Sequence, residues 1–202
     1  MRRYSKTIDA MPGTGGELAE HLVAKYELAG VKVVRGSAGE DFYSPDEKIV
    51  SLGPDHYDKK SLSAVAVAAH EVGHAIQFCR DEPVSHLRKK YMGRVFQIRR
   101  VGGILLTLAP VAMLLSKAPM VMAFFVGIGV LTMLLSVLMY VAILPEEFDA
   151  SFNKALPILG SGYLPDQHLP AARTILKACA LTYVAGALTD VLNLWRWIRF
   201  LR

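Results

Sequence analysis

The residues best suited to chemistry in this sequence form the pentapeptide His70-Glu71-Val72-Gly73-His74. Histidines four positions apart lie on one face of an α-helix, so both imidazoles can bind one metal ion. Glu71 stands beside the first histidine and can take a proton from a water that the metal polarises. The alternative is a buried helix with two incidental histidines, but unpartnered polar groups in an apolar helix are costly. The pentapeptide therefore predicts a metal site with hydrolytic chemistry.

A third ligand must come from elsewhere in the chain. The extended metzincin motif would require glycine and histidine at the positions of Gln77 and Arg80, so that class is excluded. The other common third ligand is a downstream acidic residue. Only five acidic residues follow residue 100, and three of them, Glu146, Glu147 and Asp149, lie in the octapeptide LPEEFDAS. We expect a ligand among these three; alternatively they are the solvated start of a helix, where acidic side chains are favoured.

Two further residues carry weaker predictions. Asp149 is a candidate for a hydrogen bond to a ligand histidine, and Tyr183 for a donor to the oxyanion that develops during hydrolysis. Packing in a membrane helix is the alternative for Tyr183. Gly73 costs about 1 kcal/mol in a helix interior relative to alanine, so we expect another backbone to approach it closely.

The elements that position these residues are short. Residues 14–30 predict an amphipathic helix, and residues 31–35 and 48–52 predict β-strands, with a further short strand around residues 42–43. A Pro-free apolar run from Ser61 through the pentapeptide predicts a buried helix. The result is a mainly α fold with a small β-hairpin or sheet beside the active-site helix. We expect the strand at 48–52 to expose an edge to which an extended substrate adds.

A membrane association follows from the uneven distribution of charge. Residues 1–100 hold 16 of the 23 Lys and Arg residues and 13 of the 18 Asp and Glu residues. Residues 101–144 contain one charge, Lys117, and as a helix they would reach roughly 66 Å, about twice the 30 Å hydrocarbon core. They therefore predict a transmembrane hairpin with crossings at 101–116 and 119–144. A hairpin returns the chain to the side it left, which brings the pentapeptide and the acidic octapeptide to one face of the membrane.

The domain organisation is that of one integrated domain in four parts. Residues 1–100 form the polar part with the active-site helix, 101–144 the hairpin, 145–172 the segment of the third ligand, and 173–202 a third membrane helix. The alternative for the last part is a buried or interfacial helix, since Lys177 and Asp190 interrupt its apolar run.

Charge and cysteine content narrow the function classes. The net charge of +5 gives no reason to expect nucleic acid, because the basic residues cluster beside the apolar hairpin. Six of them lie between residues 85 and 100, which predicts a cytoplasmic active site. Two cysteines cannot form a disulfide framework. The basic N-terminal residues are not followed by the apolar run of a secretory signal peptide, so none is expected.

Several motifs in order resemble one known family. VAAHEVGHAIQ, an apolar hairpin, LPxEFDAS and ALTYVAGAL resemble the YugP-type neutral zinc metallopeptidases, and the EF pair after the hairpin is more distantly similar to the HtpX and Ste24 membrane proteases. The resemblance implies an integral-membrane, gluzincin-like peptidase of the bacterial plasma membrane, with Zn²⁺ bound by His70, His74 and Glu147 and with Glu71 as catalytic base. It implies peptide or membrane-protein substrates, such as those of membrane protein quality control. Family members usually begin with another membrane helix and have an apolar residue where Glu146 stands.

Two other classes stay open. The first is a membrane scaffold that has lost activity and binds a partner subunit, which would be recognised by a missing base or ligand. The second is a metal-binding transporter or sensor, which would place charged residues along several spans. In or beside the predicted spans stand only Lys117, Lys177 and Asp190.

Overall fold

The computed structural model describes residues 2–186 and 188 of the chain. These residues fall into two compact units. The first comprises residues 1–86 and 145–181, and the second comprises residues 87–144 together with those from 182 onward. Most of the C-terminal part of the predicted third membrane helix lies outside the described residues.

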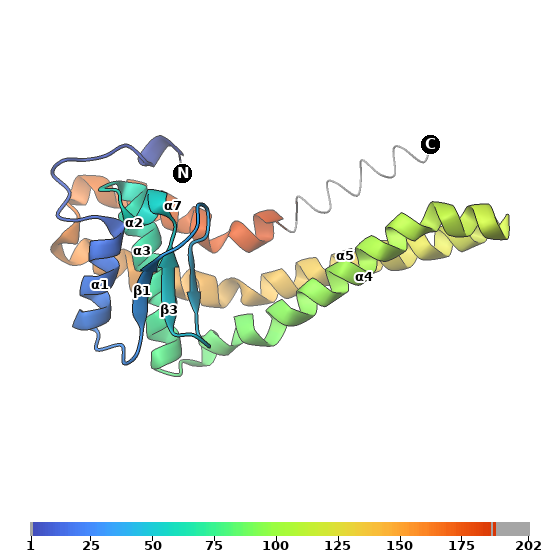
Figure 1. The fold of residues 1–202 in the computed structure, drawn as a ribbon, viewed down its shortest axis with the longest axis horizontal. Coiled ribbons are helices and arrows are strands. Elements are labelled where there is room, and N and C mark those ends of the chain that lie inside the picture. The colour runs from blue at the N-terminus through green and yellow to red at the C-terminus, as the bar shows by residue number, and fades with distance from the viewer. Residues whose placement is uncertain (1, 187, 189–202) are drawn as a thin grey trace. The chain divides into compact units, whose positions relative to one another are not determined.

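The first unit contains the short elements (Figure 1). Its N-terminal part holds η1 (Arg2–Tyr4), α1 (Gly15–Lys25), β1 (Lys32–Arg35), β2 (Phe42–Ser44), β3 (Ile49–Leu52), α2 (Pro54–Tyr57), α3 (Leu62–Cys79) and η2 (Pro83–Ser85). Its later part holds the π-helix η3 (Asp149–Ala155), α6 (Leu156–Ile158), the π-helix η4 (Leu159–Tyr163), η5 (Asp166–His168) and α7 (Leu169–Ala180). The prediction of a mainly α fold with a small sheet is confirmed.

Local capping explains where the two main helices of the N-terminal part begin. The Thr14 hydroxyl accepts the Glu17 backbone N–H, and the Glu17 carboxylate accepts the Thr14 N–H, a capping box that starts α1. The Ser61 hydroxyl accepts the N–H of Ala64 and starts α3. Each cap satisfies backbone donors that have no partner inside the helix.

The sheet order corrects one prediction. β3 lies in the centre, parallel to β1 and antiparallel to β2, in the order β1-β3-β2. The strand at 48–52 therefore has no free edge, and the expectation that it binds substrate by strand addition was wrong. β3 carries Val50 and Leu52, both fully buried, whereas β1 has exposed residues at both ends. The most apolar strand takes the central place because only there is a strand flanked on both edges by other strands.

The core of the first unit is built around α3. Every residue of α3 from Leu62 to Gln77 is buried, because α1, the sheet, η3 and α7 pack around it. Apolar side chains from α1 and α7, such as Leu22 and Leu176, belong to the same hydrophobic cluster as the α3 side chains Val65 and Ile76. A helix that is covered on all sides holds its side chains in fixed rotamers, which is a requirement for a precise site.

The second unit is a helical hairpin. α4 (His86–Ser116) ends where predicted, Lys117 adopts a positive φ of 52°, and two residues separate α4 from α5 (Pro119–Phe148). Close packing of the two helices uses Gly102 and Gly129: a Cβ at Gly102 would meet Thr132, and one at Gly129 would meet the Leu106 side chain at 2.7 Å.

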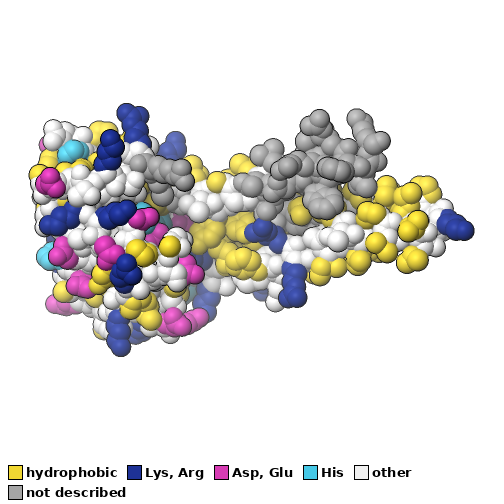
Figure 2. Space-filling model, turned by 45° about the horizontal axis from the view of Figure 1, so that its top comes forward, with side chains coloured by type: hydrophobic (Ala, Val, Ile, Leu, Met, Phe, Trp, Pro, Cys, Tyr) yellow, Lys and Arg dark blue, Asp and Glu magenta, His cyan; other side chains and the backbone are white. Residues whose placement is uncertain are grey.

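The hairpin has the length and composition of membrane-spanning helices. The two candidate spans are Pro83–Ser116 and Pro119–Tyr163, and only 11% of the most apolar 18-residue window of each is buried. Figure 2 shows exposed apolar side chains along the hairpin, with some Lys and Arg side chains among them, whereas the acidic side chains gather over the first unit. Soluble monomers rarely expose so much contiguous apolar surface, and both helices are long and apolar enough to cross a membrane.

Candidate active site

Three side chains converge on one point beside α3. His70 and His74 lie one helical turn apart, with ring centroids 4.7 Å from each other. The Glu147 Oε2 atom lies 3.4 Å from the Nε2 atoms of both histidines. Their ligand atoms all lie within 4.8 Å of one another, and all three residues are buried. The structure thus brings together the two pentapeptide histidines and one of the three acidic candidates.

The orientation of His70 is set by Ser151. The Ser151 hydroxyl donates its only hydrogen to the Leu176 carbonyl, 3.1 Å away. It therefore accepts a hydrogen from His70 Nδ1, at 3.0 Å. With Nδ1 protonated, the neutral His70 ring presents the lone pair of Nε2 toward Glu147.

The orientation of His74 is set by Gln77. The Gln77 amide nitrogen donates to the Glu146 backbone carbonyl at 2.9 Å and to Asp149 Oδ2 at 2.8 Å. The amide oxygen therefore faces His74 Nδ1, 3.0 Å away, and accepts its hydrogen. The Nε2 lone pair of His74 consequently also points toward Glu147 Oε2.

With these tautomers, the three converging atoms favour the binding of a cation. Two imidazole lone pairs and a carboxylate oxygen face one another, and such acceptors repel unless a positive charge lies between them. Among the described residues, His74 Nε2 and Glu147 Oε1 are buried without a hydrogen-bond partner. Unpartnered buried polar atoms are rare and costly. Two histidine nitrogens and one carboxylate match the donor set of a catalytic Zn²⁺ site, in which a fourth position is kept for water or substrate.

The electrostatics keep Glu147 anionic. Burial opposes its ionisation, but when no metal is bound and the two rings are protonated, the charge and hydrogen bonds of His74 and His70 outweigh that effect and hold the pKa of the carboxyl well below its usual range. Glu146 is also fully buried, but its Oε1 lies 3.9 Å from His74 Nδ1, on the side of the ring away from the three converging atoms. Adjacent helical residues point about 100° apart, so only one of the two glutamates can face the histidines.

Glu71 lies next to His70 and is buried, with 7% of its surface exposed. Within the described residues its carboxylate forms no hydrogen bond or ion pair, so both oxygens can accept a proton. Cys179 on α7 lies nearby; burial first, and then the Glu71 and Glu147 carboxylates, raise the pKa of its thiol. Cys179 therefore stays a neutral thiol, inert as a nucleophile.

Asp149 does not contact a histidine directly, as expected, but through one intervening side chain. It binds Gln77 rather than a histidine, and it also accepts hydrogen bonds from Asn153 at 2.7 Å and pairs with Lys154 at 3.3 Å. Burial opposes ionisation of Asp149, and these partners more than compensate, so the pKa is lowered. The chain that orients His74 therefore runs from Asp149 through Gln77.

Gln77 and Ser151 are the two orienting residues that our sequence analysis missed. Both have a positional signal: Gln77 lies three residues after His74, and Ser151 lies four residues after Glu147, each on the same helical face. Neither signal is specific, because a glutamine or serine at such a spacing is common on helices.

Gly73 fulfils the expectation of a close backbone approach. A Cβ atom there would lie 2.8 Å from the Ala150 carbonyl oxygen in η3. The π-helical turns of η3 widen this segment, and π-helical turns frequently occur at functional sites. Absence of a side chain at Gly73 is what lets η3 lie against α3 between the two histidines.

Tyr183 lies in the second unit. Its ring stacks on Tyr140, with centroids 6.0 Å apart, and lies under the Arg88 guanidinium at 5.9 Å. The predicted contact of Tyr183 with a reacting oxyanion stays a prediction.

The donor set of two histidines on one helix and a glutamate from a later helix fits the class of zinc-dependent peptidases. The chain belongs to the family described as "putative neutral zinc metallopeptidase", which matches residues 1–202. It is also 32% identical over 199 residues to the "putative membrane protease YugP" of Bacillus subtilis (strain 168), an alignment that covers 97% of this chain and 84% of that protein. No solved structure matches the chain. The family is thus one of zinc peptidases, and the chain has a buried His-His-Glu group that could bind a metal ion.

Proposed function

We propose that this protein is a membrane-embedded zinc endopeptidase that hydrolyses peptide bonds at the site formed by His70, His74 and Glu147, with Glu71 as catalytic base. The observation that carries the proposal is the orientation of both imidazoles, whose Nε2 lone pairs meet the Glu147 carboxylate because Ser151 and Gln77 hold the opposite nitrogens.

Each residue then has a defined task. Zinc, when bound, polarises the scissile carbonyl and lowers the pKa of water toward about 7. Glu71 accepts the proton of the attacking water and passes it to the leaving amine. Glu147, His70 and His74 hold the ion, and the dry surroundings of α3 strengthen these electrostatic interactions.

The substrate edge of the sheet is β2 in this proposal. With β3 paired on both sides, β2 has one free side among the described strands, and it packs against α3, where the Tyr43 ring lies 5.7 Å from that of Phe78. An extended peptide that pairs with β2 would run beside the active-site helix and gain main-chain hydrogen bonds without a sequence requirement. That suits a peptidase of unfolded or membrane-protein substrates, as in quality control.

We further propose that α4 and α5 span the bacterial plasma membrane with the active site on the cytoplasmic side. The basic residues at the start of α4 support this orientation, since positive flanks stay inside. Single cysteines introduced near residues 90 and 117 can be labelled from outside intact cells. We expect labelling only near residue 117, and labelling only near residue 90 would reverse the orientation.

The test of the peptidase is Glu71→Gln. This variant keeps the size of the side chain and both histidines, so we expect full zinc content and unchanged thermal stability. Cleavage of an unfolded labelled casein should fall by about 10²–10⁴-fold, the range for general-base catalysis. Glu47→Gln, at an exposed position, is the matched control and should keep wild-type cleavage.

If the zinc-loaded wild type cleaves neither casein nor a panel of unfolded membrane proteins, the peptidase proposal fails. The inactive scaffold that binds a partner subunit then becomes the function to test.

A further inference from the structure

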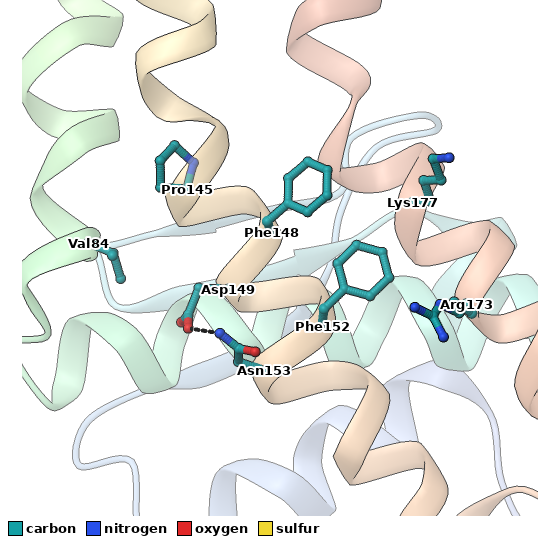
Figure 3. A pocket seen from close by; sticks show the side chains of 8 residues that line it. All are labelled: Val84, Pro145, Phe148, Asp149, Phe152, Asn153, Arg173 and Lys177. Atoms are coloured by element: carbon teal, nitrogen blue, oxygen red, sulfur yellow. Dashed lines mark hydrogen bonds between the residues drawn. The ribbon is translucent and has the colours of Figure 1, made fainter.

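One cavity of the first unit is lined by none of the three converging residues His70, His74 and Glu147. It has a volume of about 590 Å³ and is lined by residues from η2, the end of α5, η3 and α7 (Figure 3). From the α5–η3 segment it receives Pro145, Phe148, Asp149, Phe152 and Asn153. Their spacing of three and four residues groups them along one side of this segment, with Asp149 at the border, where it also binds Gln77 of α3.

The floor of this cavity is aromatic. The Phe148 and Phe152 rings lie 5.4 Å apart, tilted by 35°. Phe148 is 38% exposed although it stands in a unit with a well-filled core. Figure 3 shows both rings between the Pro145–Asp149 side of the cavity and α7. An exposed aromatic pair of this kind offers a flat apolar surface to a ligand.

The α7 wall is cationic. Arg173 and Lys177 stand one helical turn apart, both exposed, and within the described residues neither forms a hydrogen bond or an ion pair. Residues four apart on a helix have Cβ atoms about 5–6 Å apart, so both long side chains can reach one anion. The carboxylate of the lining, Asp149, is already engaged by Gln77, Asn153 and Lys154. Asp149 therefore does not neutralise the positive charges of Arg173 and Lys177.

The position of the cavity lining along the chain indicates which kind of anion would bind to these two cations. Pro145, the first α5 residue of the lining, directly follows the apolar run that ends at Leu144. In a helix that leaves a bilayer, the residues just after the hydrocarbon-spanning run lie at the depth of the lipid headgroups. Aromatic and basic side chains are the residues that favour this depth.

We propose that this cavity binds the headgroup of an anionic phospholipid, with the phosphate between Arg173 and Lys177 and the glycerol and upper acyl carbons over Phe148 and Phe152. Arginine and lysine are the preferred protein partners of phosphate. The volume falls in the range of sites that hold small ligands, about 300–1,000 Å³. The inference rests on the membrane-embedded part of the proposed function and is independent of catalysis.

The experiment uses the zinc-loaded full chain that carries Glu71→Gln, in neutral detergent, so that cleavage plays no part. Binding of dioctanoyl phosphatidylglycerol is measured by native mass spectrometry, with dioctanoyl phosphatidylcholine and glycerol phosphate as competitors. The variant Arg173→Gln with Lys177→Gln removes both cations. Its matched control, Arg3→Gln with Lys32→Gln, removes one exposed arginine and one exposed lysine outside the cavity.

We expect saturable binding of phosphatidylglycerol that neither competitor displaces at equal concentration. The cavity variant should bind about thirtyfold more weakly, since each basic residue near an anionic lipid contributes about 1 kcal/mol, and the control should match the parent. A variant with Phe152→Ser alone should also weaken binding, because the ring supports the glycerol and acyl carbons.

Three results would overturn the inference. Equal affinity of the cavity variant and its control would show that general positive charge attracts the lipid. Displacement by glycerol phosphate at equal concentration would make this a site for free phosphate esters. Displacement by an acidic peptide, added as a third competitor in a separate measurement, would make it a peptide-docking site.

The membrane-embedded part is checked separately by alkaline extraction of cell membranes. A chain that is released fails that part. A chain that stays embedded but binds no phosphatidylglycerol refutes the lipid site alone.

Discussion

Replacing Gln77 by methionine tests whether the network around His74 positions the zinc site. Methionine has nearly the same length and fills the same buried space, but it offers neither the amide oxygen nor the amide hydrogens. The substitution therefore leaves His74 Nδ1–H and the Glu146 carbonyl buried without their partners, which lie at 3.0 and 2.9 Å in the native protein. The third partner, Asp149, is partly exposed and can bind water instead.

The magnitude follows from these two buried partners. Leaving a buried donor or acceptor without its partner costs about 1–3 kcal/mol, so the free energy of unfolding should fall by about 2–6 kcal/mol. A separate effect concerns zinc. The His74 ring loses the acceptor that fixes its tautomer, and removal of such an orienting partner weakens metal binding by about 10–100-fold.

The assay is zinc competition with a chelating dye under native conditions, combined with denaturant unfolding of the metal-free protein. Ile76→Ala is the matched control, because it removes a buried side chain from the adjacent position of α3 and should destabilise by about 2–5 kcal/mol. We expect this control to keep the zinc affinity of the wild type. A zinc affinity of Gln77→Met within threefold of the wild type would refute the positioning role, as would an equal loss in Ile76→Ala.

Three further predictions concern the ligand, the helix contact and one titrating group. Glu147→Ala should abolish stoichiometric zinc binding whereas Glu146→Ala should retain it, as read by metal analysis of the purified proteins; equal retention would contradict the ligand assignment. Gly73→Ala should destabilise the protein by about 1–3 kcal/mol, the cost of an overpacked contact, although alanine has the better helix propensity. The reason is that the added methyl group would press on the Ala150 carbonyl. An unchanged unfolding midpoint in denaturant would refute this. Burial raises the pKa of Tyr43 to about 12, so the native state keeps a proton that the unfolded chain releases near pH 10. The free energy of unfolding should therefore fall between about pH 10 and 12. Tyr43→Phe should make that fall shallower in unfolding curves measured across this range.

Much of the proposed metal site was readable from the sequence because its signals are local. The spacing of His70 and His74 fixes their common face on any α-helix, and the adjacent Glu71 follows from the same helix. The hairpin was likewise readable, since 44 residues with one charge have few alternatives to two apolar helices. Its turn at residues 116–119 lies where predicted.

The order of the strands was not readable from the sequence. Three short β-rich segments predict a sheet, but the pairing of 48–52 with both neighbours depends on which faces α1 and α3 cover. Strand order is a property of long-range packing, and in the fold β3, which carries the fully buried Val50 and Leu52, takes the central place.

The tertiary structure also decided which glutamate faces the histidines and what orients each ring. The sequence narrowed the third ligand to an acidic octapeptide, in which adjacent residues differ by a rotation of about 100°. The rotation of that segment is set by the contact of Gly73 with Ala150 and by the hydrogen bonds of Ser151 and Gln77 across 81 and 69 residues of chain. Local periodicity fixes which residues share a face of one helix, whereas the way two helices face each other depends on packing between residues far apart in the sequence.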